Sequence, residues 1–177
     1  MRGQSSTLWR QRLRPQVKRF FHGPAAPLIR RALKTLLLEY YVVYGDKDRL
    51  TLPASTHVNN ALFNTVSGRI DVGEHVFFGF NVCVLTGTHD YRRLDPSRQD
   101  AVLEAINDIS IGEGAWIATN VTVLGPCQIG EWSVVGAGSL VRSDVPPYTV
   151  VAGAPAKVVK HLERPATSVA SADPGSD

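Results

Sequence analysis

His89 is the residue whose side-chain chemistry and position in the sequence most favour a catalytic role. An imidazole gains and loses a proton near neutral pH, so a histidine can take the proton of a hydroxyl group. The segment that follows His89 is rich in charged and aromatic side chains, namely Asp90, Tyr91, Arg92, Arg93, Asp95, Arg98, Asp100 and Glu104. The other histidines, for which we expect solvated or hydrogen-bonded surface positions, are His22, His57, His75 and His161.

The spacing of histidines and cysteines disfavours both a metal centre and a covalent thiol intermediate. A zinc site of three histidines, two of them five positions apart, does not fit, because His75 and His89 are much farther apart and no histidine occurs from Tyr91 through Lys160. We therefore expect no metal. Cys83 and Cys127 are too few for a disulfide framework. We interpret both as small core residues in a reducing compartment.

A six-residue period defines the elements that must position His89. Neither the 3.6-residue period of a helix nor the two-residue period of a strand explains it. In a solenoid of short repeats, each unit supplies one strand and one turn, and its aliphatic side chain points inward. The sequence therefore predicts a β-solenoid whose inward positions include Ile111, Ile117, Val123, Ile129, Val135 and Val141.

The period is weaker before residue 83 and then breaks. Counting in sixes places Asn64 at an inward position, where an amide is unusual; the same count includes Val58, Ile70, Val76 and Val82. The separation between Val82 and Ile111 is not a multiple of six, which predicts an insert over about residues 88–108. Insertions in solenoids cluster on one face, often the binding face.

Three regions follow from these patterns within the 177-residue chain. Residues 1–49 are predicted to form a basic, amphipathic helical extension, with Pro27 near the start of a helix that continues to Tyr44. Residues 50–160 form the solenoid with its insert. Residues 161–177 are rich in Ser, Ala, Asp and Pro, which predicts a disordered tail. The tyrosines expected to cover the open end of the first coil are Tyr40, Tyr41 and Tyr44.

The net charge of +3 is unevenly distributed, because nine Lys and Arg residues fall in the first 35 positions and no acidic residue precedes Glu39. Such a segment could be a solvated helix face, or it could bind an anionic surface. We expect peripheral membrane contact through residues 1–35 and no nucleic-acid partner. The segment lacks the apolar stretch of a signal peptide, and Leu36-Leu37-Leu38 is too short to span a bilayer. We therefore expect a cytoplasmic protein, peripheral at the inner membrane face.

Two stretches resemble the hexapeptide-repeat acyltransferases. They are Ile111-Gly112-Glu113-Gly114-Ala115-Trp116-Ile117 with the repeats after it, and the closing run Ser143-Asp144-Val145-Pro146-Pro147-Tyr148-Thr149-Val150-Val151-Ala152-Gly153-Ala154-Pro155-Ala156-Lys157. The closing run is similar to that of the branch that O-acetylates sugars, including maltose and galactoside acetyltransferases. The resemblance covers roughly residues 55–160. It implies a left-handed parallel β-helix with three hexapeptides per coil, and a homotrimer with active sites between neighbouring subunits.

The resemblance also implies a reaction, in which acetyl-coenzyme A donates an acetyl group to a hydroxyl of a saccharide or glycoconjugate and His89 is the general base. Asn64, Asp90 and Tyr91 are candidates for binding the acceptor, although Asn64 could instead make a turn or ladder hydrogen bond. The group that orients the imidazole stays open among Asp90, the other acidic residues of the insert and a backbone carbonyl.

Candidate coenzyme A contacts lie in the later repeats. Trp116 matches the aromatic residue beside the family's cofactor groove, and three small residues match positions where the pantetheine arm approaches the backbone, namely Ala118, Thr119 and Ala137. The basic residues that could meet the phosphates are Arg142, Lys157 and Lys160.

Three other functions are compatible with a solenoid. A zinc hydrase of the γ-carbonic anhydrase type is disfavoured by the histidine spacing. A non-catalytic scaffold would leave His89, Trp116 and the insert without a role. Acyltransferases with an amino-acid or amino-sugar acceptor share the coil and remain the catalytic alternative.

Overall fold

The computed structural model describes residues 23–38, 40–103 and 107–164, and its strands form three sheets. We name them sheets A, B and C. Sheet A comprises β1 (Val42–Tyr44), β3 (Leu62–Asn64), β6 (Cys83–Leu85), β9 (Thr122–Leu124) and β12 (Leu140–Val141). Sheet B comprises β2 (Leu50–Thr51), β4 (Ile70–Val72), β7 (Ile109–Ile111) and β10 (Cys127–Ile129). Sheet C comprises β5 (Phe77–Phe78), β8 (Trp116–Ile117), β11 (Val134–Val135), β13 (Thr149–Ala152) and β14 (Lys157–His161).

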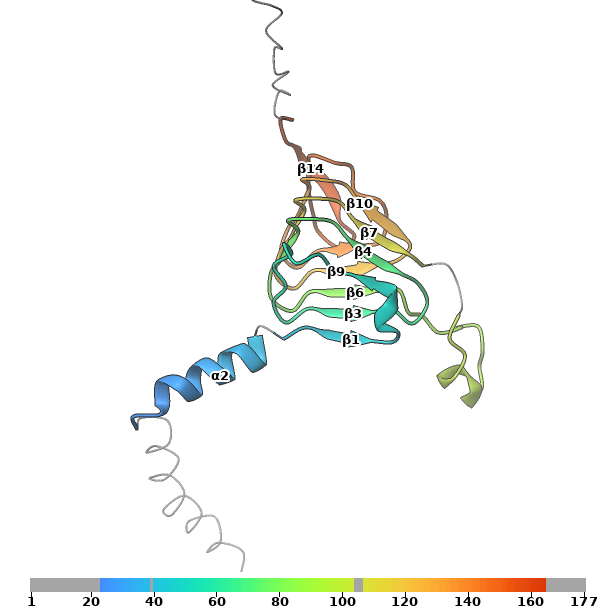
Figure 1. Ribbon diagram of the computed structural model, residues 1–177. Coiled ribbons are helices and arrows are strands. Elements are labelled where there is room, and N and C mark those ends of the chain that lie inside the picture. Colours follow the sequence, from blue (N-terminus) through green and yellow to red (C-terminus); the bar gives the residue numbers. More distant parts are fainter. Residues whose placement is uncertain (1–22, 39, 104–106, 165–177) are drawn as a thin grey trace, which may run out of the picture.

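The chain visits the three sheets in a fixed order, A then B then C, and each circuit makes one coil (Figure 1). Neighbouring coils pair in parallel, apart from β14, which turns back antiparallel to β13. Trp116 pairs with Val134 and Thr122 pairs with Leu140, so one coil of the later part is made of three units of six. The architecture is a parallel β-helix with three faces.

The six aliphatic residues that defined the period all point into the core, as predicted. Each is at most 2% exposed. Ile70, Val76 and Val82 are also buried, but they belong to a second inward row, because Ile70 pairs with Ile109 rather than with Ile111. Burying these side chains stabilises the fold by roughly 1.5–3 kcal/mol each, before conformational entropy is subtracted.

Asn64 does not occupy an inward position, so that prediction was wrong. Phe63 fills the slot instead and is fully buried, with its ring edge-to-face against Phe78 at 5.6 Å. Leu62 pairs with Cys83, which lies further along the chain than three units of six, because the turn from β3 to β4 is longer than the turn from β9 to β10. The extra length of this turn shifts the count in sixes.

The interpretation of both cysteines as core residues holds only for Cys127. Cys127 is 3% exposed, whereas Cys83 lies on the outer side of β6 and is half-buried. Strand residues alternate between the two sides of a sheet, and Val84 takes the inward position on β6.

The N-terminal region differs from the sequence-based expectation in its extent. A helix, α2, runs over Ala26–Leu38 and ends before Tyr44, and β1 pairs with β3, so the β-helix begins at Val42 rather than at residue 50. Val42 and Val43 are β-branched and favour a strand. Figure 1 shows α2 leading away from the coils. Residues 1–22 and most of the expected tail, 165–177, lie outside the described residues.

Of the three tyrosines expected to cover the first coil, Tyr41 packs on the core. Its ring lies edge-to-face against Phe63 at 5.9 Å, and Tyr40 stacks on it at 6.4 Å. Tyr44 is exposed on the edge strand β1. A hollow of about 340 Å³ remains at this end, lined by Tyr40, Tyr41, Val43, Lys47, Leu50 and Leu52.

Candidate active site

The insert leaves the coil at the corner between sheets A and B, and His89 lies at its base. Figure 1 shows the insert projecting on the side opposite α2. His89 forms an antiparallel bridge with Val102. Two backbone hydrogen bonds extend this pairing, from Asp90 N to Ala101 O at 2.8 Å and from Leu103 N to Thr88 O at 3.1 Å. The backbone of His89 is therefore held by a short ladder, while its side chain is exposed.

A buried polar network fixes the point where the insert leaves β6. The Thr86 hydroxyl donates to the carbonyl of Asn64 at 2.8 Å and accepts from the backbone N–H of Ser67 at 3.2 Å. Asn107, where the chain returns to the coil, donates its side-chain amide to the carbonyl of Thr86 at 3.0 Å. Because Thr86 and Asn107 lie on either side of the insert, this network ties its two ends together.

Asn64 supports the same corner through its side chain. Its Oδ1 accepts from the backbone N–H of Val66 at 3.0 Å, which is the turn hydrogen bond that the sequence left open. Gly87 lies directly against this amide: a Cβ added there would be 2.7 Å from Asn64 Oδ1. Gly87 precedes His89 by two residues, so this contact places the side chain of Asn64 beside the start of the insert.

The carboxylates of Asp90 and Asp95 accept hydrogen bonds from within the insert. Arg92 donates to the Asp90 carboxylate at 2.8 Å, and this hydrogen bond lowers the pKa of Asp90. The Asp95 carboxylate accepts from the hydroxyl and backbone N–H of Ser97 at the start of the short helix η2 (Pro96–Gln99), and these contacts lower the pKa of Asp95. Glu104 lies outside the described residues. Within the described residues, no side chain hydrogen-bonds to the imidazole of His89.

Two large apolar side chains of the insert face outward. Tyr91 is 77% exposed and Leu94 is 89% exposed. The guanidinium of Arg98 donates to the carbonyls of Tyr91 and Arg93, so these backbone contacts stabilise the loop and leave the Tyr91 ring uncovered. Tyr91 is therefore accessible to a ligand or to another chain.

Trp116 lies on the outer side of sheet C, and the candidate small residues lie at the corner where sheet C leads into sheet A. The Trp116 ring stacks on Phe77 of the preceding coil, with centroids 5.6 Å apart. Ala118 is buried and Thr119 is half-buried just after β8, while Ala137 is exposed one coil further on. Thr119 O accepts from Gly138 N at 2.9 Å, so the two corners are in direct contact.

The three basic candidates are exposed in the last coil, but on different sheets. Lys157 and Lys160 are in β14 of sheet C, where Lys157 pairs with Ala152. Arg142 follows β12 of sheet A. The structure thus places Lys157 near the corner that carries Ala118 and Ala137, and Arg142 at the far end of sheet A.

His89 and the candidate coenzyme A residues of sheet C and its corner with sheet A are not brought together within one chain. Each strand of sheet A begins at the corner with sheet C and ends at the corner with sheet B. Thr119 precedes β9 and His89 follows β6, so the two residues lie at opposite ends of the strands of this sheet. A catalytic centre that uses both groups would need a second copy of the chain.

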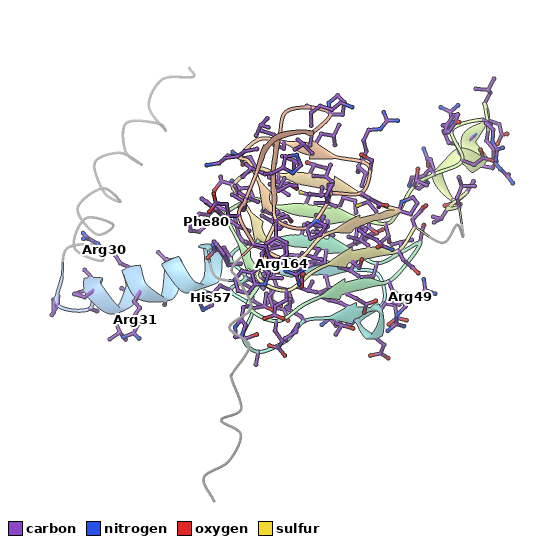
Figure 2. The ribbon with its side chains drawn as sticks, turned by 90° about the horizontal axis from the view of Figure 1, so that it is seen from above. Arg30, Arg31, Arg49, His57, Phe80 and Arg164 are labelled. Carbon is purple, nitrogen blue, oxygen red and sulfur yellow. The ribbon has the colours of Figure 1, made fainter. Side chains whose placement is uncertain are left out.

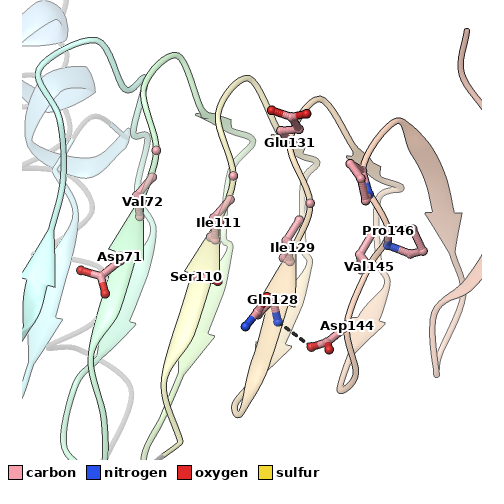
Figure 3. A pocket seen from close by; sticks show the side chains of 14 residues that line it. Asp71, Val72, Ser110, Ile111, Gln128, Ile129, Glu131, Asp144, Val145 and Pro146 are labelled. Carbon is pink, nitrogen blue, oxygen red and sulfur yellow. Dashed lines mark hydrogen bonds between the residues drawn. The ribbon is translucent and has the colours of Figure 1, made fainter. Parts of the chain in front are cut away.

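A hollow of about 620 Å³ lies elsewhere, along the outer side of sheet B (Figure 3). Its polar side chains are Asp71, Ser110, Gln128, Glu131 and Asp144, and the Asp144 carboxylate accepts from the backbone N–H of Gln128 at 2.8 Å. The hollow contains three carboxylates and no basic residue, so it would repel the phosphates of a nucleotide. In the part of the chain that the structure describes, no group of three His, Cys, Asp or Glu side chains could hold a metal ion.

Comparisons with known proteins agree with this architecture. Residues 108–143 match the family model described as bacterial transferase hexapeptide (six repeats), and this stretch is where the coils are regular. A Staphylococcus aureus (strain MRSA252) protein provisionally named an acetyltransferase is 31% identical over 152 residues, covering 79% of this chain and 75% of the relative. Galactoside O-acetyltransferase of Lactococcus lactis is 38% identical over 123 residues, covering 70% of this chain and 58% of that protein.

Among solved structures, a hexapeptide-repeat-containing acetyltransferase of Vibrio cholerae superposes with a TM-score of 0.51 and 26% identity, covering 87% of this chain and 93% of that chain. The chain belongs to the hexapeptide-repeat acetyltransferase family and has its left-handed parallel β-helix fold. It spans 44–60% of the length of three of its relatives, from Schizosaccharomyces pombe, Lactococcus lactis and Saccharomyces cerevisiae.

Proposed function

We propose that this protein is an O-acetyltransferase that transfers an acetyl group from acetyl-coenzyme A to a hydroxyl of a saccharide or glycoconjugate. The observation that carries the proposal is the position of His89, exposed at the base of the insert on a backbone held by the ladder to Val102. The similarity to a galactoside O-acetyltransferase over 70% of this chain supports a sugar acceptor.

In the proposed reaction, His89 takes the proton of the acceptor hydroxyl as its oxygen attacks the thioester carbonyl. The C–S bond then breaks, the acetyl group stays on the acceptor oxygen, and the coenzyme A sulfur leaves as a thiolate that takes up a proton. Attack is direct, without an acetylated enzyme. Burial supports this view for Cys127, because it raises the pKa of the thiol to about 11 and keeps it protonated.

We assign the coenzyme A groove to the outer side of sheet C and its corner with sheet A. Trp116 offers an exposed aromatic face, and the small residues at the corner leave backbone groups open to the pantetheine arm, namely Ala118, Thr119 and Ala137. Lys157 and Lys160 are placed to meet phosphates from the last coil, with Arg142 nearer to His89. Asn64, Asp90 and Tyr91 are the proposed acceptor contacts.

The separation of His89 from this groove favours a homotrimer in which each active site lies between two subunits. The outer side of sheet A is suited to such a contact because its exposed and half-buried residues are largely apolar, namely Val42, Leu62, Leu85, Leu124 and Leu140. We further propose that the enzyme works in the cytoplasm at the inner membrane face and modifies a polysaccharide or its precursor.

A screen of acceptor sugars with acetyl-coenzyme A, scored by thiol release, tests the function. We expect thiol release that requires both substrates together, and loss of it in His89→Ala. Rapid thiol release without an acceptor would contradict direct attack. Transfer to amino acids or amino sugars but not to hydroxyls would establish the other acyltransferase class. No transfer to any acceptor, with no acetyl-coenzyme A binding, would favour a non-catalytic scaffold.

A further inference from the structure

The helix α2 has two chemically distinct halves. The helical period of 3.6 residues places Leu28, Ile29, Ala32 and Leu33 on one half of the helix. The opposite half carries Arg30 and Arg31, and the first turn contains no acidic residue. A helix with leucines on one half and basic residues on the other is typical of segments that lie in a membrane interface.

The apolar half is exposed to a degree that is unusual for a packed helix. Leu28 is 78% exposed and Leu33 is 37% exposed. Figure 2 shows Arg30 and Arg31 on the part of α2 that lies clear of the three sheets. No helix in the described ranges is long and apolar enough to cross a membrane. Insertion of α2 would therefore be parallel to the surface, over a length of about 20 Å.

The charge of the whole chain favours one orientation on an anionic surface. Residues 1–38 contain nine basic residues and no acidic residue, whereas residues 39–177 contain ten basic and sixteen acidic residues, a net charge of −6. An anionic bilayer would attract the first part and repel the second. The acidic hollow on sheet B belongs to the repelled part.

We infer that α2 binds the surface of an anionic lipid bilayer, with Leu28 and Leu33 inserted among the acyl chains and the basic side chains at the level of the lipid headgroups. The β-helix is then tethered beside the bilayer through the few residues between Leu38 and Val42. Lipid binding does not depend on the proposed acyl transfer, so either proposal can fail without the other. If both hold, the acceptor is held on a lipid or at the membrane.

Co-sedimentation of the full chain with vesicles of phosphatidylcholine alone, or of equimolar phosphatidylcholine and phosphatidylglycerol, tests the inference. We expect binding to the anionic vesicles that weakens as salt is raised. Arg31→Gln should weaken this binding about fivefold, and the double variant Leu28→Gln/Leu33→Gln should weaken it more than about tenfold. Leu94→Gln, at a leucine in the insert that is more exposed than Leu28 or Leu33, is the control and should bind as the unmodified chain does.

Two results would overturn the inference. One is binding to anionic vesicles that the leucine double variant retains in full, since this would indicate a general affinity for polyanions such as nucleic acid. The other is an unmodified chain that does not bind the vesicles, together with a leucine double variant whose mass in solution is lower by whole subunits. This result would indicate that α2 packs against a second copy of the chain.

Discussion

The rings of Phe77 and Trp116 stack on the outer side of sheet C at an interplanar angle of 17°, one coil apart. The stack forms because parallel strands in register place equivalent positions above one another, and Phe77 pairs directly with Trp116. Phe77 thereby limits the orientations of an indole that is 43% exposed. A fixed, accessible aromatic face is what a binding groove requires.

Replacing Trp116 should therefore weaken the binding of acetyl-coenzyme A more than it slows the reaction. We expect Trp116→Ala to raise the KM for acetyl-coenzyme A about tenfold with little change in kcat, since a lost aromatic contact amounts to about 1 kcal/mol or somewhat more. Trp116→Phe should retain most of the affinity. The matched control is Trp132→Asn, at a similarly exposed tryptophan with φ of 52°, a conformation that Asn tolerates. An equal rise of KM in the control would place the groove elsewhere.

Removing the imidazole of His89 should reduce turnover without preventing acetyl-coenzyme A from binding. We expect His89→Ala to lower kcat by a factor of about 10² to 10⁴, the usual contribution of a general base. Calorimetric titration should show unchanged acetyl-coenzyme A affinity. His75→Asn is the control, because His75 has φ of 60° and lies between β4 and β5, at the corner between sheets B and C rather than at the corner that carries the insert. Full activity of His89→Ala would remove the proposed mechanism.

The sequence predicted the coil well where each circuit has three equal units. From Ile109 to Val141 every inward position recurs after three units of six, so counting alone identifies the core of these coils. The prediction failed at Asn64 because the turn between β3 and β4 is longer, and the length of one turn cannot be read from a pattern that assumes equal turns. The sequence also did not show where α2 ends and β1 begins, because the apolar residues there suit either a helix or a strand.

The sequence located His89 at the edge of the insert but missed the polar network beneath it. Thr86 and Asn107 are far apart in the chain and meet only because the insert starts and ends at one corner of the coil. The available signal was weak: each residue lies at a boundary of the segment where the count fails. The sequence also did not show that His89 and Trp116 are separated by sheet A within one chain; only the three-dimensional fold shows this.

The contact between Gly87 and Asn64 predicts a specific pattern of stability. We expect Gly87→Ala to lower the free energy of unfolding by about 1–3 kcal/mol, because the new Cβ would overlap the Asn64 amide and disturb its bond to Val66. Urea denaturation should show that Asn64→Ala combined with Gly87→Ala costs less than the sum of the single changes, since removing the amide removes the overlap. Strictly additive costs would contradict this relationship.

Cys127 should remain unreactive in the folded protein and should make stability depend on pH in the alkaline range. Its pKa is raised from 9.0 to about 11, first by burial and second by the charge of Asp144. Because the folded-state pKa is the higher one, the fold favours the neutral thiol. The resulting contribution to the free energy of unfolding is complete below about pH 9 and is lost as the pH rises toward 11.

In a Cys83→Ala background, where Cys127 is the remaining thiol, a thiol reagent at pH 8 should react only after urea is added. The unfolding free energy of this variant should fall more between pH 8 and pH 10.5 than that of Cys83→Ala/Cys127→Ala, which lacks the titrating thiol. Equal slopes in the two variants, or rapid labelling without urea, would mean that Cys127 is not held in the core.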